Sequence, residues 1–473
     1  MSFTSLAYVI FLAGVLGLYW CLGRRWQNRL LLAASWGFYG YVSPWFLALL
    51  LGLTLTCHVC ARGMARYPRR GKWLLALALT VCLGALGLFK YLDFFLGNLS
   101  ALLAALGLPS FRAGLGLILP LGISFYTFLL VGYVLDVRAG RLAPVASWAS
   151  LALLAAFFPT LQAGPIERGG HLLPQIDSPR RLTPEGLRQG LTLLIWGFFQ
   201  KLIVADNLAL VANKIFALQD PDFWLLWTGV LAFTFQILAD FSGYTDIARG
   251  SAKLLGFDLL PNFDRPYLAS SPADFWRRWH MSLSYWLRDY VYIPLGGSRR
   301  GPWRRGLNIL LTFLASGLWH GASWNFVLWG LYHGLLVLLE RVWRDVAPRG
   351  LREAAWLAPL KVAGTFALVA AGWLLFRETD LAWLWRYLSL SPWGPAGGSG
   401  LVTAYLLCTV LLYASPLAGH ALWVGLRRQA LAGGRPSLAA ALDRLAPLGS
   451  ALMFLLILAL ANPDAVNFIY FRF

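Results

Sequence analysis

Apolar segments long enough to cross a lipid bilayer recur along this 473-residue chain, from its first residues to its last. Hydrophobic residues make up 59% of the sequence, and the mean hydropathy is +0.62. A soluble globular fold would expose far more apolar surface than it could cover, whereas a bilayer accepts such surface. We therefore expect an all-α polytopic membrane protein that forms one domain over residues 1–473.

Basic clusters between the apolar segments predict which loops face the cytoplasm, because cytoplasmic loops carry an excess of Arg and Lys. The first apolar segment, residues 2–20, has no basic leader and no A-x-A cleavage pattern, so we expect it to remain as a span. Arg24, Arg25 and Arg29 then place the first loop inside and the amino terminus outside. Loops of this kind account for the net charge of +19, and we do not expect nucleic-acid binding.

The remaining apolar segments bring the expected number of transmembrane helices to about ten or eleven, with both termini outside. Pro44, in the middle of residues 30–62, indicates a helical hairpin. Residues 145–159 are too short to cross comfortably and are expected to be re-entrant or interfacial. A long basic and aromatic region, 249–305, is expected on the cytoplasmic side. Further predicted spans are 72–96, 111–136, 186–203, 223–238, 364–376, 401–413 and 448–460.

Residues 264–297 are too charged to span a membrane and too aromatic to form a free loop, which favours an element lying along the interface. Ser and Pro at 271–272 can cap and open a helix there. Asp274, Arg277 and His280 follow at steps of three, so we expect them on adjoining parts of one helical face. An interfacial helix held only by tryptophan and arginine is the simpler alternative. Three tryptophans supply an apolar counter-surface: Trp276, Trp279 and Trp286.

A histidine inside the stretch LTFLASGLWHGASWNFVLWGLYHGLLVLL is the strongest candidate for chemistry. Basic clusters flank this stretch, so both of its ends are expected in the cytoplasm. The roughly fifteen helical residues from Arg305 to His320 span about 22 Å of a core about 30 Å thick. Gly317, Gly321 and Asn325 would loosen the helix and let polar groups approach. An ionisable residue at that depth predicts a functional site, and a core histidine bonded to a backbone carbonyl is the alternative.

The other ionisable residues in apolar surroundings are expected to be structural. His333 lies on the returning helix, and Lys90 and Asp93 are one helical turn apart, so they can neutralise each other. No H-E-x-x-H spacing occurs, and we predict no catalytic metal. There is also no GxSxG elbow, P-loop or dinucleotide fingerprint in a suitable context. The remaining histidines lie near loops or span ends without convergent partners: His58, His171 and His420.

Two segments resemble motifs of the membrane-bound O-acyltransferase family, in particular its bacterial alginate O-acetyltransferase branch. They are DFWRRWHMSLSYWLRDYVYIPLGGSR, at 274–299, and LWHGASWNFVLWGLYHG, at 318–334. The resemblance implies the family's fold, with a funnel joining the two faces and the catalytic region at about 264–345. It also implies that His320 of the WHG motif is catalytic and that His280 of the WHMSL motif is often required. Lesser matches are FYG near Phe38, LFKYLDFF from Leu88, AGPIER from Ala163 and the terminal NFIYFRF.

The activity that the resemblance implies is acetyl transfer from a cytoplasmic thioester donor, expected to be acetyl-coenzyme A, to a hydroxyl acceptor outside. The product would be an O-acetylated exopolysaccharide such as alginate, and no permanently bound cofactor is expected. We predict that His320, as a neutral imidazole, acts as general base on the acceptor hydroxyl, while His280 and Arg277 position the donor. The predicted substrate-binding set also includes Asp274, Trp279, Trp286 and Asn325.

The expected setting is the bacterial inner membrane. Expected partners are membrane lipid, the thioester donor, polysaccharide synthesis machinery and a periplasmic or extracellular acetyltransferase. D-alanyl transfer or peptidoglycan O-acyl transfer by the same fold stays open, as does a route in which His320 accepts the acyl group covalently. Alternatives from other classes are a transporter of an acyl carrier, with His320 as a proton relay, and a scaffold for a synthesis complex. The absence of paired, interrupted segments disfavours the transporter.

Overall fold

The computed structural model describes residues 2–111, 114–162, 164–348, 350, 354–394 and 400–461. Within these ranges the regular structure is helical and no strand occurs. The expected all-α, multi-pass membrane architecture is thereby confirmed, whereas the predicted ten or eleven spans are not. Eight helices or helix runs of the described chain are long and apolar enough to cross a membrane: Pro44–Arg66, Pro68–Ala105, Pro184–Phe216, Phe223–Leu254, Trp324–Val346, Ala355–Arg377, Gly400–Ala432 and Pro436–Leu460.

The amino-terminal helices follow the predicted order. The first is α1 (Leu6–Trp20), a shorter apolar helix of 15 residues. It is followed by α2 (Arg24–Gly40) and α3 (Pro44–Arg66), which form the expected hairpin. Pro44 occupies the first turn of α3, where its missing N–H costs no intrahelical hydrogen bond.

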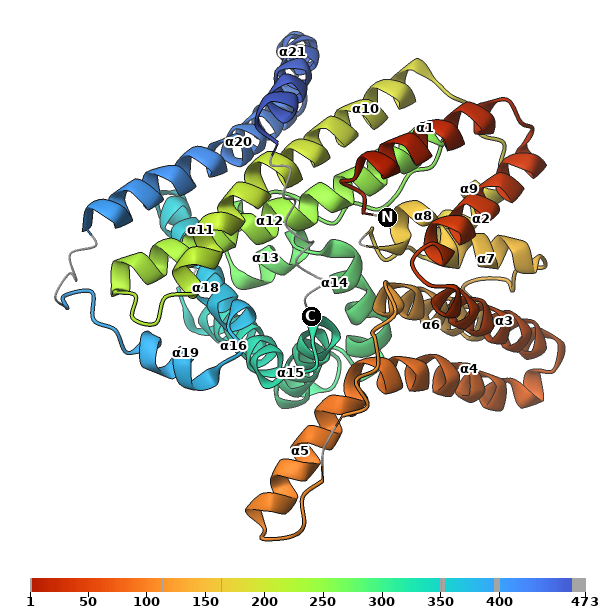
Figure 1. The fold of residues 1–473 in the computed structure, drawn as a ribbon, viewed down its shortest axis with the longest axis horizontal. Helices are drawn as coiled ribbons and strands as arrows, with labels where there is room; N and C mark the ends of the chain where they lie inside the picture. Colours follow the sequence, from red (N-terminus) through yellow and green to blue (C-terminus); the bar gives the residue numbers. More distant parts are fainter. Residues whose placement is uncertain are drawn as a thin grey trace.

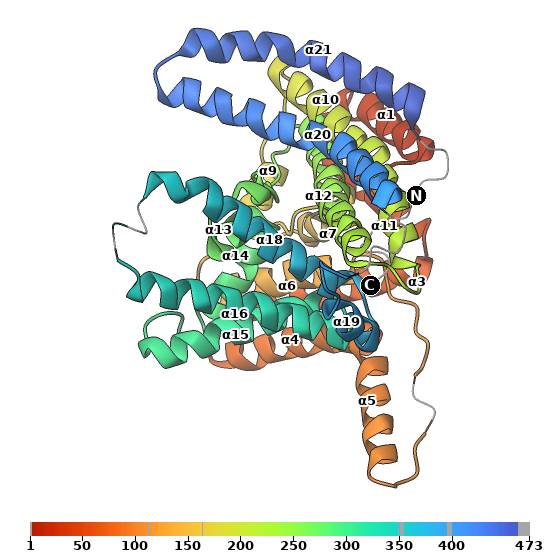
Figure 2. The same ribbon diagram turned by 90° about the vertical axis from the view of Figure 1, so that its left-hand side faces the viewer.

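The next helix run bends sharply away from the body. It comprises α4 (Gly71–Leu86), a π-helical turn (Gly87–Tyr91) and α5 (Leu92–Ala105). Both ribbon views show α5 projecting from the rest of the molecule (Figures 1 and 2). The π turn therefore marks the point where the chain changes direction.

The return from α5 differs from the prediction. The expected span from 111 is α6 (Ile123–Arg138), and the described residues between 111 and 122 form no helix. The Asp93 carboxylate accepts hydrogen bonds from the N–H groups of Leu115, at 2.8 Å, and Gly116, at 3.1 Å. These bonds take up amide groups that a helix would use. Gly122, at φ 72°, then starts α6 and passes too close to another backbone segment for a side chain to fit.

Three short helices follow α6, and the re-entrant or interfacial placement expected for residues 145–159 stays a prediction. They are α7 (Trp148–Ala156), α8 (Phe158–Leu161) and α9 (Gly169–Asp177). The residues from Leu151 to Leu161 are almost entirely buried. Figure 1 shows α7, α8 and α9 near α2. The AGPIER segment between α8 and α9 begins at Ala163, which lies outside the described residues.

A long central helix corrects a second prediction. The chain continues through α10 (Pro184–Phe199), a π-helical turn (Gln200–Ala205), α11 (Asp206–Phe216) and α12 (Phe223–Leu254). The last of these ends 16 residues beyond the expected end at 238. Lys201 explains the extension, because its ammonium pairs with Asp206 at 2.7 Å and with Asp240 at 2.9 Å. With its charge paired, Asp240 can lie within an apolar bundle.

The carboxyl-terminal helices are longer than the predicted spans. After two short helices, α13 (Pro272–Arg278) and α14 (Met281–Leu287), the chain forms a hairpin of α15 (Gly301–His320) and α16 (Trp324–Val346). It ends in α18 (Ala358–Arg377), α19 (Leu381–Leu388), α20 (Gly400–Ala432) and α21 (Pro436–Leu460). The last two form a pair at the periphery (Figures 1 and 2). An ion pair of Arg427 and Asp443, at 2.6 Å, joins them.

We expect Lys201→Met to lower the free energy of unfolding by about 3–5 kcal/mol, because it leaves two buried carboxylates without their ammonium partner. The measurement is chemical unfolding of the purified protein in detergent. Lys253→Met is the matched control, since the carboxylate that Lys253 pairs with, Asp258, is exposed to solvent. The control should change the free energy by less than about 0.5 kcal/mol. Equal losses in the two variants would contradict this account of α12.

Candidate active site

The two motif histidines meet in the buried centre of the protein. The ring centroids of His280 and His320 are 6.2 Å apart, and both side chains are almost fully buried. His280 lies between α13 and α14, which occupy the middle of the view in Figure 1, and His320 is the last residue of α15. The structure thus brings together the two residues predicted to be catalytic.

A break in the backbone turns His280 inward. The expected helical face of Asp274, Arg277 and His280 is wrong, because α13 ends at Arg278 and His280 adopts the left-handed conformation at φ 41°. Asn262 holds this break. Its carbonyl accepts a hydrogen bond from Met281 N–H at 3.0 Å, and its side-chain oxygen accepts one from Ser282 N–H at 3.3 Å.

Asp274 and Arg277 remain near the surface. Ser271 caps α13 as expected, accepting a hydrogen bond from Asp274 N–H at 3.2 Å. The Asp274 carboxylate pairs with Arg277, whose side chain is 62% exposed, and with Arg278. Partial burial raises the pKa of Asp274, but hydrogen bonds from Arg278 and from Ser270 N–H bring it below its ordinary value. Neither Asp274 nor Arg277 reaches the histidine pair, and a role for them in binding the donor stays a prediction.

Aromatic rings enclose His320. The centroids of Trp319 and Trp329 each lie 5.0 Å from its ring, and that of Phe376 lies 5.4 Å away. The ring centroid of His333 lies 5.0 Å from that of Trp329, and neither ring nitrogen of His333 has a hydrogen-bond partner among the described residues. The surroundings of His320 are therefore aromatic on the side of α16 and α18.

The other predicted substrate-binding residues pack or form hydrogen bonds with neighbouring elements of the fold. Trp279 is fully buried and packs against Phe263 and Trp373, with centroids 5.0 and 4.7 Å away. Trp286 donates a hydrogen bond to the carbonyl of Phe128 at 2.9 Å. Asn325 donates one from its amide to the carbonyl of Leu375 at 3.2 Å, which ties the start of α16 to α18. Direct contact of these three with substrate stays a prediction.

A cavity of about 150 Å³ lies beside His320. Lys90, which the sequence assigned to a structural ion pair with Asp93, lines this cavity instead. Its ammonium donates hydrogen bonds to the carbonyls of Trp319, at 2.5 Å, and of His320, at 3.2 Å. The position within LFKYLDFF, one of the lesser family matches, was the available signal. The other residues around the cavity are 119–125, Gln162 and Trp319.

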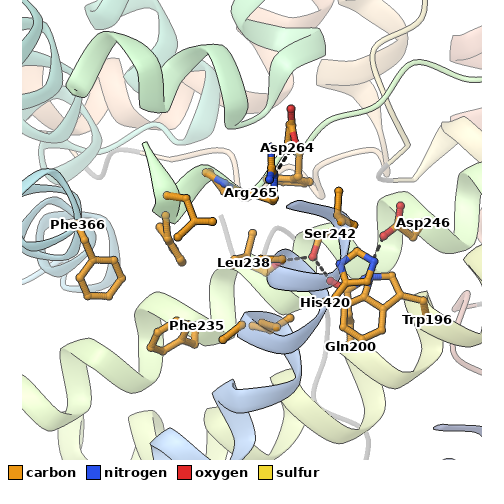
Figure 3. Close-up of a pocket in the computed structure, with 18 of the residues that line it drawn as sticks. Trp196, Gln200, Phe235, Leu238, Ser242, Asp246, Asp264, Arg265, Phe366 and His420 are labelled. Atoms are coloured by element: carbon orange, nitrogen blue, oxygen red, sulfur yellow. Dashed lines mark hydrogen bonds and ion pairs between the residues drawn. The ribbon is translucent and has the colours of Figure 1, made fainter. Parts of the chain in front are cut away.

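A larger cavity of about 410 Å³ lies between α12, α18 and α20 (Figure 3). Asp264 at its edge pairs with Arg265 at 3.3 Å and with Arg428 at 2.9 Å. His420, which was expected to lack convergent partners, stacks on Trp196 in its wall at a centroid distance of 4.4 Å. The cavity and the histidine pair are adjacent but separated by aromatic rings: Phe263, Phe241 and Trp279.

Comparison with known proteins identifies the enzyme class. The profile of the membrane-bound O-acyltransferase family matches residues 146–354, which include both histidines. The protein is an O-acyltransferase embedded in a membrane. A probable alginate O-acetylase AlgI of Pseudomonas putida is 41% identical over 388 residues, covering 80% of this chain and 78% of the relative. The chain belongs to the membrane-bound O-acyltransferase family, as its two motifs indicated.

Two further relatives extend the comparison. A probable alginate O-acetylase AlgI of Azotobacter vinelandii is 38% identical, covering 89% of this chain and 87% of the relative. A peptidoglycan O-acetyltransferase of Helicobacter pylori is 34% identical, covering 74% of this chain and 71% of the relative. The names of these two proteins describe O-acetylation of alginate and O-acetyl transfer to peptidoglycan.

The position of His320 depends on a close contact of α15 with α16. A Cβ atom on Gly330 would overlap the carbonyl oxygen of Phe313, and one on Gly317 would overlap that of Phe326. We expect Gly330→Ala to destabilise the protein by about 1–3 kcal/mol, because the two helices must separate. Thermal unfolding and acetyl-transfer rate are the measurements.

Gly306→Ala on α15 is the matched control for this contact. A Cβ atom there would meet only Leu338, at 3.6 Å, which is an ordinary van der Waals distance. The control should leave stability unchanged or raise it by about 0.5–1 kcal/mol, because alanine favours a helix. A loss of the same size in both variants would show that the close approach does not set the position of His320.

Proposed function

We propose that the protein transfers an acetyl group from a thioester donor at the cytoplasmic face to a hydroxyl acceptor at the outer face, for O-acetylation of an exopolysaccharide such as alginate. The observation that carries this proposal is the burial of His280 and His320 side by side, within the family-matched region and beside a cavity. The alginate O-acetylases among the relatives favour alginate as acceptor over peptidoglycan.

The chemistry assigned to His320 is general-base catalysis. Its neutral imidazole accepts the proton of the acceptor hydroxyl while the hydroxyl oxygen attacks the thioester carbonyl carbon, which forms a C–O bond and a tetrahedral oxyanion. Collapse of this intermediate breaks the C–S bond. The sulfur leaves with the proton from the imidazolium, so an ester and a free thiol are the products. The ring of His280, 5.5 Å from Trp319 and 6.2 Å from His320, positions the donor.

The charge and apolar character of the two cavities support a route for the donor through one cavity and a route for the acceptor through the other. The larger cavity has apolar walls and two arginines, Arg265 and Arg428, that share one carboxylate. This combination suits a donor with anionic phosphates and an uncharged, thiol-ended arm, such as acetyl-coenzyme A. The smaller cavity adjoins residues 119–125, which follow a loop expected outside, and suits approach of a hydroxyl acceptor.

The proposed setting is the inner membrane of a bacterium, with both termini outside. Membrane lipid, the polysaccharide synthesis machinery and a separate periplasmic or extracellular acetyltransferase are the proposed partners. The donor acts as a substrate, and the proposed reaction needs no permanently bound cofactor. The terminal NFIYFRF match and residues 395–399 lie outside the described residues.

We expect His320→Ala to lower the rate of acetyl transfer by a factor of about 10² to 10⁴, because the general base is lost. The measurement is transfer from labelled acetyl-coenzyme A by the purified protein in lipid nanodiscs, with alginate oligosaccharide as acceptor. His171→Gln, which affects a histidine bonded to Glu167 at the protein's edge, is the control and should keep the activity. A stable His320→Ala protein with full transfer activity would contradict the general-base mechanism.

The same assay separates the alternatives. A transporter or a scaffold would transfer no label in purified form. A covalent acyl-histidine would appear as label that stays on denatured wild-type protein and is absent from His320→Ala. Direct attack predicts no such retained label.

A further inference from the structure

Lys90 is a cation in the cavity wall whose hydrogen bonds, within the described chain, go to no carboxylate. They go to the carbonyls of Trp319 and His320 and, at 3.4 Å, to the hydroxyl of Ser124. Asp93, one turn away, is occupied with backbone N–H groups of the segment before α6. None of these contacts supplies a formal negative charge that would compensate the Lys90 ammonium.

An ammonium group inside an apolar bundle is costly unless its surroundings stabilise it. Two of its three N–H donors face the carbonyl end of α15, where the helix dipole favours a cation. The third contact, to Ser124, is long for a hydrogen bond. This leaves the ammonium with capacity for one strong acceptor, and the cavity is the space from which that acceptor can approach.

The position of Lys90 is fixed by the π-helical turn. This turn directs Lys90 and its neighbour Tyr91 to the same end of α15, where the Tyr91 hydroxyl donates to the carbonyl of Leu318 at 2.7 Å. The two residues differ in one respect that matters here. Lys90 lines the cavity beside His320, and Tyr91 does not.

We propose that this cavity is an oxyanion site in which the Lys90 ammonium stabilises the tetrahedral intermediate of acyl transfer. The inference rests on the proposed function. When the acceptor oxygen bonds to the thioester carbon, the π electron pair moves to the carbonyl oxygen, and Lys90 donates a hydrogen bond to that oxygen without giving up its proton. When the C–S bond breaks, the oxyanion's electron pair re-forms the carbonyl, and the sulfur leaves with the proton from the His320 imidazolium as a thiol. Lys90 is unchanged at the end of the cycle.

Kinetics of Lys90→Met, Lys90→Arg and Tyr91→Phe in the full-length protein test the catalytic role. We expect Lys90→Met to lower kcat by a factor of about 10² to 10³ with the donor KM changed less than about twofold. Lys90→Arg keeps the charge in another geometry and should lose about tenfold. Tyr91→Phe removes a hydrogen bond to the same helix end and should keep kcat within about threefold. Unchanged kcat in Lys90→Met, or equal losses of kcat and melting temperature in Lys90→Met and Tyr91→Phe, would overturn the proposal.

Binding of methylphosphonate, a small tetrahedral anion, tests the site without requiring turnover. We expect its affinity to fall at least tenfold in Lys90→Met and to stay within about threefold of wild type in Tyr91→Phe. If the wild type transfers no acetyl group but binds methylphosphonate in a Lys90-dependent way, the proposed function is refuted and the anion site is retained. If the wild type transfers acetyl groups but Lys90→Met leaves methylphosphonate affinity unchanged, only the oxyanion site is refuted.

Discussion

The backbone contact of α15 with α16 is the constraint on which the site depends. Gly317 and Gly330 let the two helices approach until a methyl group would no longer fit between them. In a membrane, where water does not drive helices together, such close packing is a main source of attraction. It fixes the turn after His320, and the rings of Trp329 and Phe376 then enclose the imidazole.

Polar groups inside the bundle are satisfied by partners far along the chain, which is why spacing alone predicted some of them wrongly. Lys201 lets α12 continue past Asp240, where hydropathy predicted an end. Lys90 bonds to carbonyls of α15 instead of its near neighbour in sequence. Asn262 holds the break that turns His280 away from the helical face assigned to it. None of these pairings leaves a periodic signal in the sequence.

Local signals, in contrast, were sufficient for several elements. A proline at a helix start is favourable whatever surrounds it, so the hairpin at Pro44 and the capped start at 271–272 were predictable. The fold class followed from composition, and the family from two motifs. Counting residues from the basic cluster before α15 predicted that His320 lies deep in the membrane. The structure shows that the end of α15 is buried within the protein, and the depth stays a prediction. The cavity beside it needed the folded chain.

Helices α15 and α16 run antiparallel, so the start of α15 and the end of α16 lie at the same face. His320 is the last residue of α15, a helix of 20 residues that is roughly 30 Å long. The length of α15 therefore sets the distance of His320 from this one face only. A host that lengthens its fatty acids adds hydrocarbon beyond the hairpin tip and leaves the opposite approach at its original length.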